Sequence, residues 1–455
     1  MNMLSTLRST LSSSLSSLFS GGRASAVSVG ITTGTLGVLF DISFAALIFS
    51  NSLSDYLSAG IGFVLFSAAA ARIMVALMSS FPGTVSDLAA IPTAILSWST
   101  GMVVRELPPT ATQGELLITV IVTIALTSLL TGLFLWTLGE LKLGSVVRLL
   151  PDSVIGGFMA SSGLLLIKGA GGILIKQPLE DFSLQNLVQT TTLMQCLPGV
   201  LLAVYLLMVT RRYRHSFVIT SSLVGAIALF YVALSLLGIS PAAANEQGLT
   251  LGIPSLQTTW QLLSWSDLLR INWQAIGSQW MCAGTVSVLT AVLLLMNVKG
   301  MEMAIADDID INYELKVAGS ANVLLGMGGG ILSFHSMGGS MLMHKLGGRS
   351  RWVTVIGAAT FITLPLLFSS WLTYFPTSIL GGLLLYLGLS CLYEWVIRAQ
   401  KKLSKVDYFT VQLIWVVSGV VGFLQALALG WAIAVALLIH RFFFSKQLFN
   451  GRFKA

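Results

Sequence analysis

Residues 150–157 read LPDSVIGG, and residues 375–382 read FPTSILGG, 225 positions further along the chain. The first copy opens the fifth apolar stretch of the sequence, and the second copy opens the twelfth. If every stretch crosses a membrane, seven spans separate the copies. Because seven is odd, the copies enter the membrane from opposite sides, which is the signature of an inverted-topology repeat. The alternative is chance, since short runs of Pro, Ser and Gly arise easily in apolar sequence.

Composition identifies the apolar stretches as membrane spans. Of the 455 residues, 55% are hydrophobic and only 9% are charged, whereas a soluble domain carries about 25% charged residues. The net charge of +7 is spread in short clusters between apolar stretches, as in the loops of membrane proteins, so we expect no nucleic-acid partner. Cys196, Cys282 and Cys391 lie far apart in apolar surroundings. We therefore expect small core residues there, and neither a metal nor a cofactor.

The lengths of the stretches predict the architecture. A helix needs about 20 apolar residues to cross the bilayer. The candidates cover residues 26–50, 57–79, 86–100, 113–138, 152–174, 188–210, 216–238, 274–298, 314–328, 335–346, 352–371, 377–397, 407–424 and 425–444. Stretches 86–100 and 335–346 are too short to cross alone. The sequence thus predicts an all-α polytopic membrane protein with 14 transmembrane spans in a 7+7 inverted repeat, in which spans three and ten are half-helices.

Lysine and arginine predict the orientation of the chain. Loops on one side carry basic clusters such as residues 211–214 and 398–405, while the other side keeps only Arg105, Lys176 and Arg270. Such a bias places both termini in the cytoplasm, and we expect a bacterial inner (plasma) membrane. The expected segments are a cytoplasmic lead at 1–25, a first repeat at 26–238, an extracytoplasmic loop at 239–273, a second repeat at 274–444 and a cytoplasmic tail at 445–455.

Spans three and ten hold the same place in each half, and proline or glycine interrupts both. A half-helix is expected to begin near Pro92, because proline favours the first helical position, and the other near Ser336. Two such N-termini at the midplane would present free N–H groups and positive dipole ends, which bind an anion without lysine or arginine. The alternative is that the glycines only allow close helix packing. The expected substrate-binding residues are Phe44, Pro92, Thr93, Ser336, Gly338, Gly339 and Ser340.

Two acidic residues and two histidines lie near these spans. Asp41 is in the middle of span one, where a carboxylate is costly and by default a functional candidate; it could bind Na⁺, take a proton or pair with a neighbouring helix. Asp87 has the spacing of a capping box with Thr84, and a cation-ligand role is the alternative. His335 and His344 flank span ten at nine residues apart, which does not fit an i,i+4 metal site. His335 could donate to an anion.

Four elements resemble the SulP (sulfate permease) family of anion transporters. They are INYEL, GSAN and GGG within residues 311–330, GGRS at 347–350, LPDSVIGGF at 150–158 and IPTAILS at 91–97. The resemblance implies a fourteen-span fold with core and gate domains, an anion site between spans three and ten, and a homodimer.

Three features depart from that family pattern. Many members carry a cytoplasmic STAS domain, and this sequence shows none up to Ala455. Some members have an arginine in the tenth half-helix, where this chain has Gly339, so the site would rely on backbone and hydroxyl groups. Members coupled to cations often have a glutamate in span eight, where this chain has Asn297.

We therefore expect a secondary active transporter that moves sulfate, bicarbonate, chloride or a small dicarboxylate by alternating access. Asp41, Asp87 and Asn297 are the expected coupling-ion positions, for Na⁺ or H⁺. The alternatives are a nucleobase/proton symporter of the same fold, which Asn297 disfavours, and an anion channel. The sequence has no His-Glu-x-x-His, no Gly-x-Ser-x-Gly and no paired intramembrane aspartates, so we do not expect an enzyme.

Overall fold

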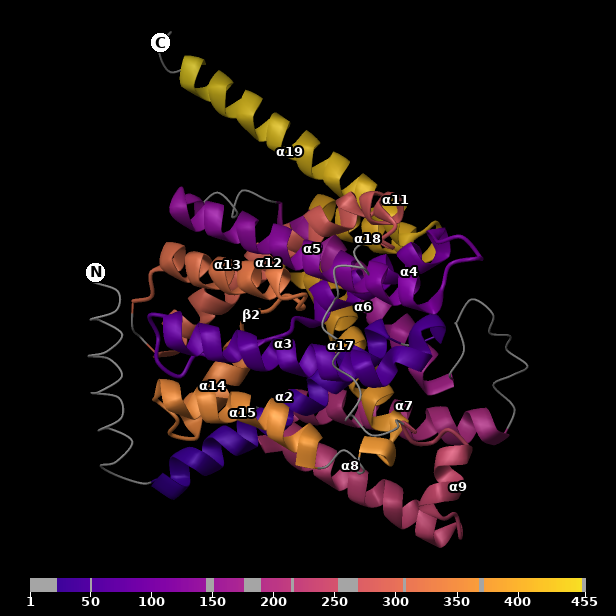
Figure 1. The fold of residues 1–455 in the computed structure, drawn as a ribbon. Helices are drawn as coiled ribbons and strands as arrows, with labels where there is room; N and C mark the ends of the chain where they lie inside the picture. The colour runs from indigo at the N-terminus through magenta and orange to yellow at the C-terminus, as the bar shows by residue number, and fades with distance from the viewer. Residues whose placement is uncertain are drawn as a thin grey trace.

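The computed structural model describes residues 23–49, 51–144, 151–175, 190–213, 217–252, 269–305, 308–367 and 372–451. Most of the predicted N-terminal lead, the middle of the 239–273 loop and the end of the tail lie outside these ranges. The described chain is helical almost throughout (Figure 1). Its elements are α2 Arg23–Ile48, η1 Asn51–Tyr56, α3 Leu57–Met78, β1 Ser86–Asp87, α4 Ala90–Glu106, α5 Gln113–Glu140, α6 Asp152–Ile175, α7 Thr190–Arg212, α8 Phe217–Leu236, α9 Pro241–Glu246, α11 Trp273–Gly277, α12 Trp280–Ile305, α13 Ile311–Met327, β2 Phe334–His335, α14 Met337–Lys345, α15 Arg351–Leu367, α17 Thr377–Leu392, η6 Tyr393–Ile397, η7 Arg398–Lys401, α18 Lys405–Val420 and α19 Phe423–Gly451.

Every one of the fourteen predicted spans contains a helix of this series. Within the described ranges, seven helices are long and apolar enough to cross a membrane by length and composition. The two predicted half-helices are short: α4 has 17 residues and α14 has 9. At 1.5 Å per residue they measure about 25 Å and about 14 Å, less than the hydrocarbon thickness of about 30 Å. The predicted fold class is confirmed.

Helix contacts come in matched pairs, as an inverted repeat requires. Spans one to seven are α2 to α8, and spans eight to fourteen are α12 to α15 and α17 to α19. Helix α3 packs on α15 as α5 packs on α13, and α2 packs on α15 as α12 packs on α5. In the same way α7 packs on α17 as α6 packs on α18. In each case, replacing both helices of one contact by their counterparts seven spans away gives the other contact.

The contacts divide the helices into two bundles. The core bundle contains α2 to α5 and α12 to α15, and the gate bundle contains α6 to α8 and α17 to α19. Fewer contacts join the bundles, chiefly those of α4 with α6 and of α2 with α17. This division is the one that the family resemblance implies.

Glycines of the repeated motif allow close packing within the gate bundle. A Cβ atom on Gly157 would lie 2.7 Å from a side-chain carbon of Ile414 on α18. On Gly382 it would lie 2.9 Å from the carbonyl oxygen of Gly199 on α7. The two copies therefore hold equivalent helix crossings, and this explains why small residues recur 225 positions apart.

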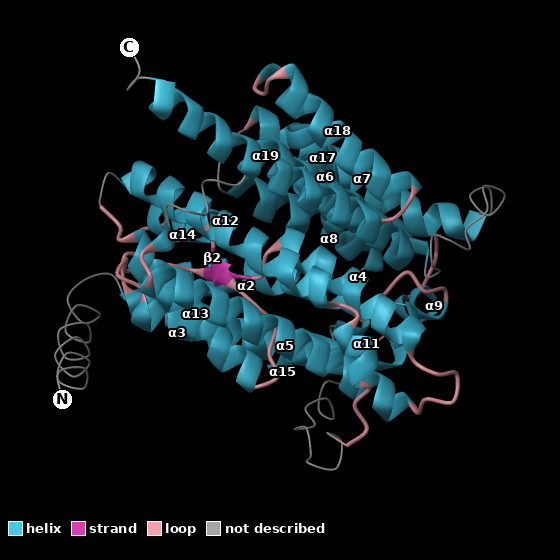
Figure 2. Cartoon of the chain, turned by 90° about the horizontal axis from the view of Figure 1, so that it is seen from above, coloured by secondary structure: helices cyan, strands magenta, loops and turns pink. Residues whose placement is uncertain are grey.

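The segments before the two half-helices form the single strand pair of the described chain. Strands β1 and β2 are antiparallel, with Ser86 opposite His335 and Asp87 opposite Phe334. The pair lies inside the helical body, where α3 contacts β1 and α12 contacts β2 (Figure 2). This pairing brings the starts of α4 and α14 together.

Candidate functional site

A cavity of about 590 Å³ lies between the two bundles, next to the start of α14. Helices α2, α3 and α14 and the segment from β1 to α4 form its core side, while α7, α8 and α17 form its gate side. Of the ten residues predicted for the site, six line this cavity: Asp41, Phe44, Asp87, Ser336, Gly338 and Gly339. Its mouth includes the exposed residues Tyr213 and Lys345.

Ser336 starts α14 in the way the sequence predicted. Its hydroxyl oxygen accepts a hydrogen bond from the amide of Gly339 at 3.1 Å, so it is the N-cap. The amides of Met337 and Gly338 have no acceptor within the helix, and they lie at the positive end of its dipole. A Cβ atom on Gly338 would meet nothing within 4 Å. The backbone here is therefore open to a ligand.

Helix α4 differs from its prediction. It begins at Ala90, so Pro92 is its third residue rather than its first. Proline has no N–H, and the amide of Thr93 bonds to the carbonyl oxygen of Ala89 at 2.9 Å. Only the amides of Ala90 and Ile91 remain without a helical acceptor. Pro92 and Thr93 are buried away from the cavity, which only Ala90 reaches from this helix.

Ser340 and Asn297 also lie outside the cavity lining, and both hold the strand pair. The hydroxyl oxygen of Ser340 accepts from the amide of Val85 at 2.9 Å. The side-chain amide of Asn297 on α12 donates to the carbonyl oxygen of His335 at 2.8 Å. These bonds fix the two strands to α14 and α12.

Asp87 does not cap a helix, so the predicted capping box is wrong. It is the second residue of β1, and its carboxylate pairs with Arg72 of α3. The side chain of Arg72 is 2% exposed and also lies over the ring of Phe361, 4.2 Å from the ring centre. Sequence reasoning missed Arg72, although an arginine alone in an apolar span is itself a signal of function.

Asp41 lies in the same cavity wall and is 2% exposed. Its Oδ2 atom has no hydrogen-bond partner among the described residues. Phe44, one turn further along α2, is also buried and lines the cavity. The described ranges contain no group of three His, Cys, Asp or Glu side chains placed to hold a metal ion.

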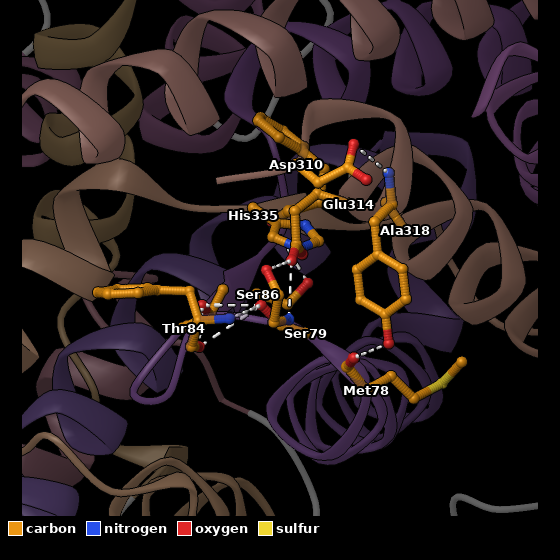
Figure 3. A network of polar contacts seen from close by, with 12 residues as sticks. Met78, Ser79, Thr84, Ser86, Asp310, Glu314, Ala318 and His335 are labelled. Carbon is orange, nitrogen blue, oxygen red and sulfur yellow. Dashed lines mark hydrogen bonds and ion pairs between the residues drawn. The ribbon is translucent and has the colours of Figure 1, made fainter. Parts of the chain in front are cut away.

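A buried acid–base pair joins Glu314 of α13 to His335 of β2 (Figure 3). His335 Nε2 lies 2.6 Å from Glu314 Oε2, and both side chains are 1% exposed. Glu314 Oε1 also accepts from the backbone amide and the hydroxyl of Ser80. The sequence left open that His335 could donate to an anion, but its Nε2 atom faces Glu314 and it is not among the residues that line the cavity. The pair ties α13 to the segments that precede both half-helices.

Together, a core bundle, a gate bundle and a half-helix terminus at a cavity between them are arranged as in a membrane transporter. The chain belongs to the sulfate permease family, whose pattern it matches over residues 24–414. The family resemblance read from the sequence is thereby confirmed.

Two curated relatives show how far the likeness reaches. A vacuolar basic amino acid transporter of Saccharomyces cerevisiae is 25% identical over 334 residues, which are 71% of this chain and 32% of that protein. A probable sulfate transporter of Mycobacterium tuberculosis is 24% identical over 270 residues, which are 57% of this chain and 46% of that protein. The chain thus spans less than half of the length of these relatives.

Two solved structures share the fold. The transmembrane domain of the cyanobacterial bicarbonate transporter BicA has a TM-score of 0.61 and 19% identity, covering 89% of this chain and 97% of that one. The murine Solute Carrier 26 family member A9 anion transporter, in the inward-facing state, has a TM-score of 0.68 and 18% identity, covering 93% of this chain and 68% of that one.

Proposed function

We propose that this protein is a secondary active transporter whose substrate carries an anionic group, moved by alternating access of the cavity between core and gate bundles. The observation that carries the proposal is the strand pair Ser86–Asp87 with Phe334–His335, which holds the start of α14 against that cavity. Sulfate, bicarbonate, chloride and a small dicarboxylate are the simplest candidates. Relatives of the chain bear names with sulfate, bicarbonate and anion transport in them.

In this proposal the start of α14 receives the anionic group. The amides of Met337 and Gly338 and the hydroxyl of Ser336 are donors at a positive helix end. Phe44 closes the cavity wall beside them. Pro92, Thr93, Ser340 and Asn297 act indirectly, by shaping α4 and holding the strands. Transport then requires the core bundle to move against the gate bundle, so that the cavity faces each side in turn.

The carboxylate of Asp41 in the cavity wall favours the binding of a cation together with the anion. Asp87 is compensated by Arg72, but the Oδ2 atom of Asp41 has no partner among the described residues. Two like charges 4 Å apart repel by about 4 kcal/mol at an effective dielectric constant of 20. An anion beside Asp41 is therefore favoured only when a proton, Na⁺ or another cation is bound there too. This makes Asp41 the coupling position of the proposal, rather than Asp87 or Asn297.

Orientation and assembly belong to the same proposal. The cavity mouth at Tyr213 and Lys345 lies next to the basic residues Arg211 and Arg212. Basic clusters favour the cytoplasmic side, so we place the mouth and both termini there, in a bacterial inner membrane. The two repeats would then occupy residues 26–238 and 274–444, joined by an extracytoplasmic loop, and the protein would work as a homodimer.

Uptake by proteoliposomes across a panel of anions, with and without a Na⁺ gradient, tests the proposal. Saturable uptake with trans-stimulation, reduced in Ser336→Ala, is the expected result. A sustained single-channel current without trans-stimulation would instead identify an anion channel. Saturable uptake of uracil would identify a nucleobase symporter. That function is disfavoured because position 297 is an asparagine and not a glutamate.

A further inference from the structure

On the basis of the transport function proposed above, we infer that the substrate supplies its own cation: Asp41 binds an ammonium group while the start of α14 binds the carboxylate of the same molecule. The substrate class is then an amino acid, and not a purely inorganic anion. Three observations support this inference. They are the missing hydrogen-bond partner of the buried Asp41, the distribution of charge in the cavity, and the size and lining of the cavity.

Asp41 is a buried carboxylate with a vacant hydrogen-bonding position. It is 2% exposed, and its Oδ2 atom has no partner among the described residues. The nearby hydroxyls on α2 do not turn to it, because Thr33 donates to Val29 and Gly30 and Ser43 donates to Leu39. Buried polar groups are normally satisfied, so an unpartnered carboxylate in a cavity wall indicates a ligand that donates hydrogen bonds.

Among the described residues of the inner cavity, Arg72 is the one basic side chain for two carboxylates, Asp41 and Asp87. Among its described lining residues the basic side chains are Arg72 and Lys345. Arg72 pairs with Asp87 and lies over the ring of Phe361, while its Nε atom has no hydrogen-bond partner among the described residues. Lys345 is exposed at the last turn of α14, at the opposite end of that helix from Ser336. The inner part of the cavity therefore combines two carboxylates with one guanidinium group and one positive helix end, so an added ammonium group would balance the side-chain charges.

That combination fits both ends of an amino acid. The amides at Met337 and Gly338 suit a carboxylate, and Asp41 suits an ammonium group, which has three donors. A bare Na⁺ is a poorer match, since hard cations gather several oxygen ligands.

The volume and the lining agree with an organic substrate. About 590 Å³ lies within the range of small-molecule sites, roughly 300–1,000 Å³, and is far more than an inorganic anion fills. Leu36, Phe40, Ile219 and Leu387 provide an apolar wall for a carbon side chain. A relative of the chain is named a transporter of basic amino acids.

Competition for uptake by three matched probes tests the inference with the native protein. The probes are L-alanine, N-acetyl-L-alanine, which lacks the ammonium group, and ethylamine, which lacks the carboxylate; L-lysine extends the series. We expect L-alanine or L-lysine to be taken up without a Na⁺ gradient. N-acetyl-L-alanine and ethylamine should each bind with an affinity at least about tenfold lower than that of L-alanine, since each has lost a hydrogen bond between charged groups.

The variant Asp41→Asn should separate the two ends of the substrate. We expect affinity for the amino acid to fall about tenfold or more, while competition by N-acetyl-L-alanine is unchanged or stronger. Glu246→Gln, an exposed acid on α9, is the matched control and should change neither. If Asp41→Asn does not fold, the probe series on the native protein decides.

The possible failures are distinguishable. Saturable uptake of sulfate or bicarbonate without any uptake of amino acids would overturn the inference and leave the proposed transport function standing. Equal losses for L-alanine and N-acetyl-L-alanine in Asp41→Asn would also overturn it. No saturable uptake of any probe would contradict the transport function itself.

Discussion

Arg72 of α3 and Asp87 of β1 form an ion pair in the wall of the cavity between the core and gate bundles. The pair joins a full-length span to the strand that precedes a half-helix. Gly339 lets the carboxylate come close to α14, since a Cβ atom there would lie 2.8 Å from Asp87 Oδ2. Where some family members have an arginine on the tenth half-helix, this chain places its cation on α3 and an acid against the helix start.

Breaking this pair should be costly. We expect Arg72→Met to lower the free energy of unfolding by about 3–5 kcal/mol, because a carboxylate is left uncompensated in a largely buried place. Thermal unfolding in detergent, followed by tryptophan fluorescence, measures the change. Lys299→Met is the control, since Lys299 pairs with Glu302 at the surface and exposed pairs contribute about 0–1 kcal/mol. Equal losses in the two variants would contradict a structural role for Arg72.

Gly37 of α2 leaves the space that the guanidinium group of Arg72 occupies in the cavity wall. A Cβ atom there would collide with the guanidinium group of Arg72 and lie 2.7 Å from Cζ of Phe361. We expect Gly37→Ala to destabilise the protein by about 1–3 kcal/mol through overpacking and to impair uptake. Gly101→Ala on α4 is the matched control, because a Cβ atom meets nothing there. It should be neutral or stabilising by up to about 1 kcal/mol through helix propensity.

The pair of Glu314 and His335 should be as important for stability as Arg72 and Asp87. Glu314→Ala removes the acceptor for both Ser80 and His335, and we expect a loss of about 3–5 kcal/mol. Glu314→Gln should cost less, because an amide oxygen still accepts from Ser80 and its NH₂ group can donate to the imidazole.

The matched control for this pair is an exposed ion pair that also involves α13. Lys316 of α13 pairs with Glu140 at 3.4 Å, and the two side chains are 38% and 54% exposed. Glu140→Ala should therefore change stability by no more than about 1 kcal/mol. A loss in Glu314→Ala no larger than this would show that the buried pair does not hold the strands.

The fold could be predicted from sequence because it rests on span length and one repeated motif. Those signals are local and survive without coordinates. The residues of the candidate site were harder to predict. Ser336 could be placed because an N-cap serine precedes its helix directly, whereas α4 starts two residues before Pro92 for want of a comparable cap.

Long-range pairs could not be read from the sequence. Asp87 lies three residues after Thr84, and this local spacing suggested a capping box. In the structure Asp87 pairs instead with Arg72 of α3, fifteen residues earlier in the chain. The spacing of Glu314 and His335 gives no hint that the turn between α13 and β2 brings them together. Such pairs depend on tertiary packing, which single-sequence patterns do not record.

Gly338 and Ser340, two residues apart on α14, should differ sharply in their access to water. Gly338 lines the cavity with free space around its Cβ position, whereas Ser340 is fully buried and holds the amide of Val85. With Cys196, Cys282 and Cys391 replaced by serine or alanine, we expect Gly338→Cys to react with a membrane-impermeant thiol reagent in open membranes. Ser340→Cys should react only after unfolding. Two residues along an α-helix lie on nearly opposite faces. Similar rates at the two positions would therefore mean that the start of α14 does not face the cavity, and the proposed substrate site would have to lie elsewhere.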